Sequence, residues 1–516
     1  MNLKLFSKAI LLTTFLVNFA SIGYSQQLAF PSADGGGKFT TGGRGGNVVI
    51  VKSLGDFGGA LKSSGPKTIV FRVSGTIKGN FHIPDNTTIA GQTAPGDGIC
   101  LNGSVTMGSN VIVRYIRIRG QPSYDCLGAR EKKNIIVDHV STSFSRDENL
   151  SVYHNDNATI QWCLISEAMG GDHGFAGIWG GNMNTQHHNL IAHNNGRNPR
   201  FCGGAQNNDY RNNVLYNWGK HPTKGGEDKQ NFDDKGIWVF SAINFVANYY
   251  KPGPYTAAIG ETVFCMPGGG SWYVKDNVMH DDPALTADNW KGFTGGKKRS
   301  EPAPHVPMTN QQTAEEAYKS VLQYAGCSFP KRDALDERVV SEVAAGTASK
   351  GNKGMVTSIS QVGGMPTLNS APAPADSDND GMPDAWEKAN GLNPNDPKDQ
   401  NGKGAGGYTN IENYINSLVS DRTGITTPAK QEMVSHGLHL TRANSHAINY
   451  SFPARSTVKL ELFAITGKKV ALLINEVKEA GNYSVDYSSL NLGTGPYICR
   501  LSSGNTAVAR NIFITQ

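Results

Sequence analysis

The chain has 516 residues, of which 38% are hydrophobic and 18% charged, with a net charge of +5 at neutral pH. This balance excludes a disordered protein, and because no long run of lysine or arginine occurs, it also excludes a nucleic-acid-binding protein. Glycine accounts for 61 residues, well above the usual ~7%, which excludes a helical bundle and favours a chain with many turns. At this length we expect two to four domains.

Residues 1–25 have the features of a secretory signal peptide. Lys4 and Lys8 give a positive start, residues 9–20 are mostly apolar, and small residues precede Gln26, where we expect cleavage. A membrane anchor is the alternative, but the apolar run is shorter than the ~20 residues that span a bilayer. No later segment is long and apolar enough to span one, so we expect a secreted protein without a membrane span in the mature chain.

The seven cysteines have no spacing that is typical of a zinc site or a redox pair. Export permits disulfides, but the sequence does not determine how these cysteines would pair. We expect buried apolar side chains with at most one or two disulfides among Cys100, Cys126, Cys163, Cys202, Cys265, Cys327 and Cys499.

Short β-rich segments that begin with asparagine recur between about residues 110 and 281. Repeats of this length are typical of a solenoid, and alternation of apolar and polar residues over so few positions excludes helical repeats. We predict a right-handed parallel β-helix over residues 26–350, with the asparagines stacked as a ladder. A β-propeller is less consistent, because its repeats are longer. One series is Asn110, Asn134, Asn157, Asn184 and Asn208, and the other is Asn189, Asn213, Asn244 and Asn277.

Two helices are predicted after the solenoid strands. Thr313 and Glu316 form a capping box before the first, and Asp333 precedes the second, which we expect to end near Gly346. Both carry apolar residues at helical spacing, so we expect them to pack against the solenoid. Residues 351–374 are rich in Gly, Ser, Pro and Ala and are predicted to be a linker that decouples the following module.

Residues 375–422 are predicted to form a small calcium-binding module. Its loop has carboxylates at positions 1, 3, 5, 9 and 12 and a glycine at position 6, and it resembles an EF-hand-like or thrombospondin type 3-like loop. A second copy at 401–412 has Lys403 and Ala405 at positions 3 and 5, so we expect it to have lost most of its affinity. The predicted Ca²⁺ ligands are Asp376, Asp378, Asp380, Asp384 and Glu387.

After a second linker at 423–434, the alternation of apolar and polar residues returns in residues 435–516. This pattern predicts a small antiparallel β-sandwich. The segments LELFAITGKKV, GPYICRL and the ending ARNIFITQ resemble the C-terminal sorting domain of the type IX secretion system of Gram-negative bacteria. The resemblance implies export through the periplasm to the medium or the outer cell surface, with the type IX secretion machinery as a partner.

Acids, a histidine and arginines recur at intervals of about one solenoid coil. The spacings are 22, 26 and 24 residues along the series of positions 125, 147, 173 and 197. Neighbouring strands lie ~4.8 Å apart, so residues one coil apart stack on one another. We therefore expect these side chains and their close neighbours to line one groove. They are Asp125, Asp147, Glu148, His173, Arg197 and Arg200.

Several segments together resemble polysaccharide lyase family 1, the pectate lyases: AFPSADGGGKFTTGGRGGNVVIV, TIVFRVSGTI, NIIVDHVSTSFSRDENLSV, GIWGGN and NPRF. The resemblance covers roughly residues 28–345. It implies a right-handed parallel β-helix that cleaves polygalacturonate by β-elimination, with Ca²⁺ bridging the substrate carboxylate and acids of the protein. The chemistry agrees, because a cation and guanidinium groups stabilise the enolate-like transition state that forms when the C5 proton leaves.

The family pattern assigns roles to three of these residues. Asp125 and Asp147 correspond to calcium-binding acids, and Arg197, followed by Pro199, corresponds to the proposed catalytic base. An arginine has a pKa above about 12, so two roles stay open for it. Either a deprotonated minority form takes the proton, or the guanidinium acts electrostatically while hydroxide takes it.

The sequence departs from the family pattern at three positions. The third calcium acid is replaced by Ser151, with Glu148 as a possible substitute, and the second arginine is replaced by Cys202, with Arg200 nearby. The substrate-binding lysine aligns near His173. The predicted metal ligands are thus Asp125, Asp147, Glu148 and Ser151, the catalytic residues Arg197 and Arg200, and the substrate-binding residues His173 and Arg200.

Two alternatives to a pectate lyase remain open. A pectin lyase would act on methylated substrate without calcium, but acids in the groove serve little purpose without a cation. A non-catalytic pectin-binding or adhesion protein is favoured by the replacements at positions 151 and 202. Our prediction is a monomeric secreted pectate lyase that uses Ca²⁺, acts on polygalacturonate or pectin, and binds no nucleic acid.

Overall fold

The computed structural model describes residues 26–420, apart from 121–122 and 231–237, and most of residues 439–514. The predicted signal peptide at 1–25 and the predicted linker at 423–434 lie outside the described residues. The chain divides into two compact units, one that ends near residue 425 and one that contains the C-terminal strands.

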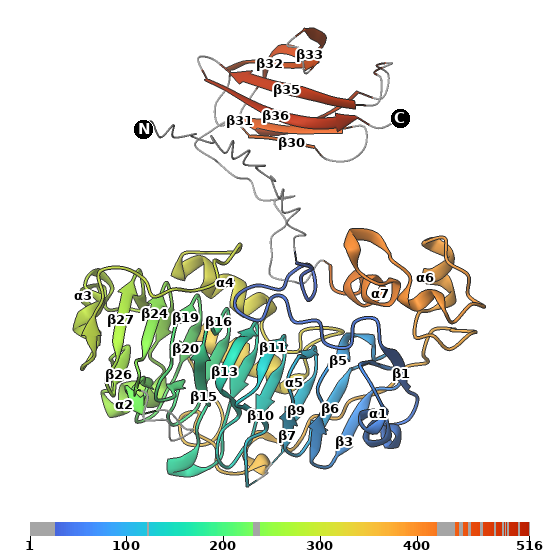
Figure 1. The fold of residues 1–516 in the computed structure, drawn as a ribbon. Helices are drawn as coiled ribbons and strands as arrows, with labels where there is room; N and C mark the ends of the chain where they lie inside the picture. The colour runs from blue at the N-terminus through green and yellow to red at the C-terminus, as the bar shows by residue number, and fades with distance from the viewer. Residues whose placement is uncertain are drawn as a thin grey trace, which may run out of the picture. The chain divides into compact units, whose positions relative to one another are not determined.

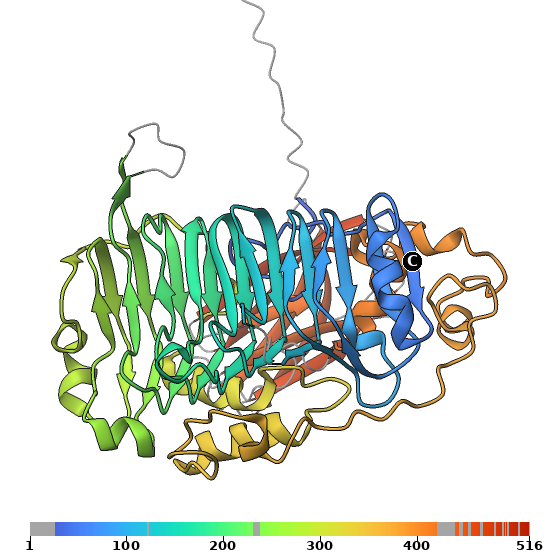
Figure 2. The same ribbon diagram turned by 90° about the horizontal axis from the view of Figure 1, so that it is seen from below.

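The first unit is a parallel β-helix, as the repeat predicted. Its coils stack in chain order, from blue to yellow-green in Figures 1 and 2, and each complete coil adds one strand to each of three faces. The first face contains β4 (Phe81–Ile83), β7 (Val105–Met107), β10 (Leu127–Arg130), the first half of β13 (Leu150–Gln161), β15 (Ile178–Asn182), β18 (Arg200–Phe201), β21 (Thr223–Gly225) and β26 (Cys265–Pro267).

The other two faces complete each coil. The second face contains β1 (Asn47–Val51), β2 (Lys67–Phe71), β5 (Thr87–Ala90), β8 (Val111–Arg114), β11 (Lys133–Asp138), the second half of β13, β16 (Thr185–His187), β19 (Asn208–Arg211), β24 (Ala242–Val246), β27 (Ser271–Lys275) and β29 (Lys297–Lys298). The third face contains β3 (Gly75–Lys78), β6 (Ile99–Asn102), β9 (Arg117–Arg119), β12 (Ser141–Ser143), β14 (Leu164–Ser166), β17 (Leu190–Ala192), β20 (Val214–Tyr216), β25 (Tyr249–Lys251) and β28 (Val278–Met279).

The core of the β-helix is built from apolar side chains that stack in register. On the second face, Ile89 lies opposite Val113, Val113 opposite Val137, and Ile135 opposite Ala158. All of these side chains are buried, as are the neighbouring apolar residues of the other faces. Burial of one such aliphatic side chain contributes roughly 1.5–3 kcal/mol, so the repeated stack stabilises the solenoid coil by coil.

An asparagine ladder runs along the turn between the second and third faces. Asn189 Nδ2 donates to Asn213 Oδ1 (2.9 Å), Asn213 to Asn248 (3.1 Å), and Asn248 to Asn277 (2.9 Å). The prediction of a ladder is confirmed for this second series, but Asn244 is wrong as its member. Asn244 lies inside β24 and bonds to Ala303 instead, because the ladder position comes after that strand, at the turn. In the first series, the bond from Asn157 to Asn134 (3.2 Å) is the only one between members among the described residues, so a continuous ladder there is wrong.

Two helices cover the third face, as predicted: α4 (Ala314–Tyr324) and α5 (Ala334–Ala345). The capping box is present, with the Glu316 N–H donating to Thr313 Oγ1 at 3.2 Å. The second helix ends at Gly346, whose φ of 72° lies in the left-handed region that glycine adopts at little cost. Val321 and Val339 pack against Leu190 and other residues of the third face. Shorter helices are α1 (Phe57–Lys62), α2 (Pro254–Ile259) and α3 (Pro283–Ala287).

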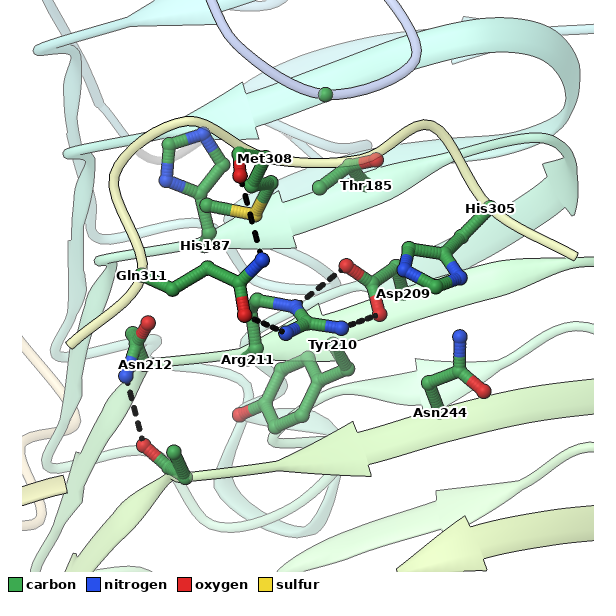
Figure 3. A network of polar contacts seen from close by, with 12 residues as sticks. Thr185, His187, Asp209, Tyr210, Arg211, Asn212, Asn244, His305, Met308 and Gln311 are labelled. Carbon is green, nitrogen blue, oxygen red and sulfur yellow. Dashed lines mark hydrogen bonds and ion pairs between the residues drawn. The ribbon is translucent and has the colours of Figure 1, made fainter. Parts of the chain in front are cut away.

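Extended segments of chain cover part of the second face. The Asp34 carboxylate accepts hydrogen bonds from the Thr309 N–H (2.8 Å) and hydroxyl (2.9 Å), which ties the N-terminal arm to the segment around residue 309. Below that segment, Arg211 forms a buried bidentate ion pair with Asp209 and also donates to Gln311 Oε1 at 3.1 Å (Figure 3). The hydrogen bond from Arg211 to Gln311 therefore ties the covering segment to β19.

Residues 375–420 form the predicted small module, which contains α6 (Asp384–Ala389) and α7 (Asn410–Ser417). Met382 and Ile411 pack against Val70 and Ala90 of the second face. Two ion pairs reinforce this contact: Arg72 with Asp376 at 2.6 Å, and Arg44 with Glu412 at 2.7 Å. The module therefore lies against the first coils of the β-helix (Figure 1).

The segment 351–374 does not decouple the module from the β-helix, so this expectation is wrong. The Asn369 carbonyl accepts a hydrogen bond from the Asp97 N–H (2.9 Å), and the Ser370 hydroxyl accepts one from the Ser74 N–H (3.0 Å). The physical reason is that the module is small, so its few apolar side chains become buried only by packing against the β-helix. The segment that leads to it consequently follows the surface of the solenoid.

The second unit contains two antiparallel sheets, as predicted for the C-terminal sandwich. One contains β30 (His439–Arg442), β31 (Ala447–Phe452) and β34 (Gly481–Asp486); the other contains β32 (Ser456–Ala464), β33 (Lys469–Lys478), β35 (Gly495–Ser503) and β36 (Thr506–Ile514). Ile448 of the first sheet and Leu460 and Leu501 of the second belong to one buried cluster. The two sheets thus share a core.

All seven cysteines are free and buried, which confirms burial and leaves no disulfide among them. Within the described ranges, no helix combines the length and the apolar character that crossing a membrane requires.

Candidate active site

The predicted site residues lie together at the N-terminal ends of the first-face strands. Asp125 precedes β10, Asp147 and Glu148 precede β13, and Arg197 precedes β18. The turns themselves stack, because Phe175 forms parallel bridges with Glu148 on one side and with Gly196 on the other. The one-coil spacing seen in the sequence therefore places these side chains side by side.

Three carboxylates form the centre of the site. Asp125, Asp147 and Glu148 each offer an oxygen within 4.8 Å of the other two. Burial raises the pKa of Asp125, and burial together with the charge of Asp125 raises the pKa of Glu148 to about 9. Carboxylates held this close repel one another unless a cation lies between them, and oxygen donors are the ligands that Ca²⁺ prefers. The residues present fit a calcium ion.

Ser151 lies beside this cluster and is buried. Its hydroxyl accepts a hydrogen bond from the Ile178 N–H at 3.2 Å, and its closeness to the Asp125 carboxylate opposes the rise in the pKa of that group that burial causes. The serine thus orients one carboxylate of the cluster. Glu148 supplies the third carboxylate, which the family pattern places at position 151.

Arg197 is held between an acid and an aromatic ring. Its guanidinium forms an ion pair with Glu148 and lies 4.2 Å from the centroid of the Phe175 ring. The backbone of Arg197 has a φ of +49°, an uncommon conformation for a residue with a side chain. The ion pair and the ring contact therefore fix this arginine next to the carboxylates.

Arg200 belongs to a hollow of about 260 Å³ that adjoins the acid cluster. Its guanidinium lies 3.1 Å from Glu227, and it lies opposite Lys224 in the strand register. The sequence reasoning did not identify Lys220, His221 and Lys224, which line the same hollow. The spacing from 197 to 220 and from 200 to 224 repeats the one-coil interval, so the same signal could have found the two lysines.

His173 and Cys202 have different surroundings. The His173 side chain is 72% exposed, with Nδ1 3.8 Å from Asp147 Oδ1, so it stands at the rim of the acid cluster. Cys202 is buried in the β-helix core, where its thiol pKa is raised to about 11 by burial. Arg200 is therefore the cation that this chain presents to the hollow near that position.

A second acid cluster lies in the module of residues 375–420. Asp376, Asp378 and Asp380 offer oxygens within 4.8 Å of one another, and Asp380 does the same with Glu387 and Asp399. Both carboxylate oxygens of Glu387 are buried and lack a hydrogen-bond partner among the described residues. Burial raises the pKa of Asp380 and of Glu387 to about 7. This donor set also fits a calcium ion.

Two acids, Asp384 and Asp399, depart from the ligand set that the sequence predicts. The Asp384 carboxylate accepts hydrogen bonds from the Ser377 N–H (2.7 Å) and hydroxyl (2.8 Å), and it belongs to neither acid group found among the described residues. Asp399 lies outside the loop pattern and was missed, because the chain brings it back to the loop only in three dimensions. In the second copy, Glu412 pairs with Arg44, and no acid group is found there among the described residues.

The chain is similar to curated fungal proteins over most of its length. It is 34% identical over 420 residues to a probable pectate lyase C of Aspergillus fumigatus, which covers 76% of this chain and 94% of the relative. It is 33% identical over 438 residues to a probable pectate lyase C of Aspergillus flavus, covering 79% and 98%. No model of a known protein family matches the chain.

Solved structures give more distant likenesses. The cedar pollen allergen jun a 1 is 16% identical, with a TM-score of 0.43 over 56% of this chain and 90% of that one. A pectate lyase bound to a hexasaccharide is also 16% identical, with a TM-score of 0.43 over 59% and 99%. The assignment follows from the fungal relatives, which match at more than 30% identity over nearly their whole length. The chain belongs to the pectate lyase family of polysaccharide lyases.

Proposed function

We propose that this chain is a secreted pectate lyase that cleaves (1→4)-α-D-galacturonan by calcium-assisted β-elimination and releases 4,5-unsaturated oligogalacturonides. The observation that carries the proposal is the meeting of three carboxylates, those of Asp125, Asp147 and Glu148, with the guanidinium of Arg197. The names of the fungal relatives support the substrate class. The acids at the centre favour a calcium-dependent enzyme over a pectin lyase that works without a cation.

β-Elimination removes the C5 proton, forms the C4–C5 double bond and breaks the C4–O bond, whose oxygen leaves with a proton from water. Calcium held by Asp125, Asp147 and Glu148 would supply a Lewis acid for the substrate carboxylate. Arg197 contributes positive charge beside the developing enolate, from a position fixed by Glu148 and Phe175. Hydroxide is the base in this scheme, because a guanidinium keeps its proton at neutral pH.

Ser151, Arg200 and His173 have supporting roles in this proposal. The Ser151 hydroxyl orients Asp125 within the metal site. Arg200 faces the hollow and binds a substrate carboxylate, and the exposed ring of His173 binds the sugar chain at the rim. The monomeric state belongs to the same proposal, since all of these residues come from one chain.

The remaining parts of the chain are proposed to serve stability and export. Asp376, Asp378, Asp380, Glu387 and Asp399 bind a second, structural Ca²⁺ in the module that packs on the β-helix. Residues 1–25 direct the chain to the periplasm, and residues 435–516 are the address that the type IX secretion machinery reads. The enzyme then acts in the medium or at the outer cell surface.

The test is an elimination assay on purified protein with polygalacturonate. Elimination creates a double bond conjugated with the carboxylate, so ultraviolet absorbance should rise in the presence of calcium and should stop when a chelator is added. Activity on methylated pectin that persists with chelator would identify a pectin lyase. Binding of polygalacturonate without any rise in absorbance would identify a non-catalytic binding protein.

A further inference from the structure

A row of stacked strand positions that includes two cationic side chains leads away from the acid cluster across the first face. Ile178 lies opposite Arg200, Arg200 opposite Lys224, and Lys224 opposite Met266, on the successive strands β15, β18, β21 and β26. Ile178 itself donates its N–H to Ser151 at the acid cluster. Since neighbouring strands lie ~4.8 Å apart, this row follows the β-helix axis from the metal site to Lys224.

The cations of the hollow differ in their partners. Arg197 pairs with Glu148, Arg200 with Glu227 at 3.1 Å, and the exposed Lys220 with Asp172 at 2.6 Å. Lys224 has no hydrogen-bond or ion-pair partner for its ammonium among the described residues of 26–420. The Arg200 Nε is likewise buried without a partner among these residues.

Lys224 is placed where an ammonium is costly. It is half-buried, and burial together with the charges of Arg200 and Arg197 lowers its pKa, against a smaller opposing effect of Glu227. A charge that is partly removed from water and flanked by like charges gains most from an anion that binds beside it. A carboxylate is such an anion, and Arg200 offers it a second donor.

We propose that Lys224, together with Arg200, is a carboxylate-binding site for a galacturonate unit next to the reacting one, and that it selects for substrate without methyl ester at that unit. The proposal rests on the proposed pectate lyase function. A polyuronate that crosses the first-face strands would pass from the acid cluster over Ile178 to the Arg200–Lys224 pair. A methyl ester there would remove the charge that Lys224 binds and leave the ammonium unpaired.

The test compares Lys224→Met with Lys220→Met. Methionine keeps the length of the lysine stem without its charge, and Lys220 is the matched control because it borders the same hollow but is exposed and paired with Asp172. We expect Lys224→Met to lower kcat/KM on polygalacturonate about tenfold, mainly through KM, which is the scale of one charge-assisted hydrogen bond. On substrate of high methyl esterification the same variant should lose little, and Lys224→Arg should restore most of the activity.

A binding measurement keeps this proposal separate from the proposed function. Titration calorimetry with oligogalacturonates in the presence of chelator reports on Lys224 even if no elimination occurs, and melting curves confirm that the variants are folded. Weaker binding in Lys224→Met, with Lys220→Met unchanged, supports the carboxylate site. Equal losses on both substrates, or unchanged oligogalacturonate affinity in Lys224→Met, would overturn it. Absence of elimination in the unaltered protein would count against the proposed function alone.

Discussion

The acid cluster on the first face and the acid cluster in the 375–420 module use similar residues in different surroundings. At the first face, Glu148 is paired with Arg197, Asp147 is 41% exposed, and a hollow adjoins the cluster. In the module, both oxygens of Glu387 are buried and lack a partner among the described residues. A metal site that must admit substrate keeps an open side, whereas a closed site serves stability. The surroundings, more than the acids, distinguish the two.

We expect the largest effect on turnover from replacing Arg197, the cation beside the acid cluster on the first face. Arg197→Lys keeps a positive charge but loses the planar contact with Phe175 and the fork that meets Glu148. Turnover should fall at least about a hundredfold, the scale of one transition-state electrostatic partner. The melting temperature should stay the same, because the side chain contributes little to the core. Near-normal turnover in steady-state assays would remove Arg197 from the mechanism.

The second prediction concerns the acid cluster in the 375–420 module. Glu387→Gln should abolish the part of the calcium-dependent stabilisation that comes from the module's site, because it removes a buried ligand of a module packed on Val70 and Ala90. At a hundredfold excess over Kd, that stabilisation is about 2.7 kcal/mol. Turnover at saturating calcium should be unchanged. The check is the calcium dependence of the melting temperature, and a variant that gains as much stability from calcium as the unaltered protein would contradict the assignment.

The third prediction concerns the pH dependence of the stability that the acid cluster of the 375–420 module provides. Asp380 and Glu387 have pKa values raised to about 7 in the folded state, so the folded chain binds protons that the unfolded chain has released. Without calcium, stability from this module should therefore be present near pH 4 and fall as the pH rises toward 7.

The matched comparison is again Glu387→Gln. In chelator the variant should melt higher than the unaltered protein near pH 8, since glutamine cannot ionise, and the difference should vanish as the pH falls to about 4. Saturating calcium should reverse the order near pH 8. A difference between the two proteins that does not depend on pH would show that the carboxyl of Glu387 does not titrate in this range.

Removal of the C-terminal sandwich is expected to have the smallest effect on catalysis. A chain that ends at residue 434 keeps the whole β-helix unit, so it should cleave polygalacturonate at the full-length rate in vitro. In the native host it should remain in the periplasm, because the proposed sorting address is gone. Lyase activity in the culture medium and in the periplasmic extract checks this. Equal secretion of both chains would assign the sandwich a different role.

Local patterns in the sequence were enough to predict the architecture and most of the candidate site. The one-coil recurrence of strands predicts the β-helix, the capping box at Thr313 predicts α4, and the spacing of Asp125, Asp147 and Arg197 predicts their meeting. These predictions succeed because residues that are one coil apart along the chain lie next to each other in a solenoid. Every coil of similar length places equivalent positions one strand apart.

Contacts between distant parts of the chain needed the tertiary structure. The ladder selects Asn248 over Asn244 because coils of unequal length shift the turn, and Asp399 joins the loop acids because the module folds back on itself. That Lys224 has no partner for its ammonium among the residues that the structure describes likewise depends on which acids the neighbouring coils present. The sequence by itself determined the repeat and the chemistry-bearing residues, since both follow from periodicity. Only the tertiary structure decided their partners, because burial and pairing arise from residues that are remote along the chain.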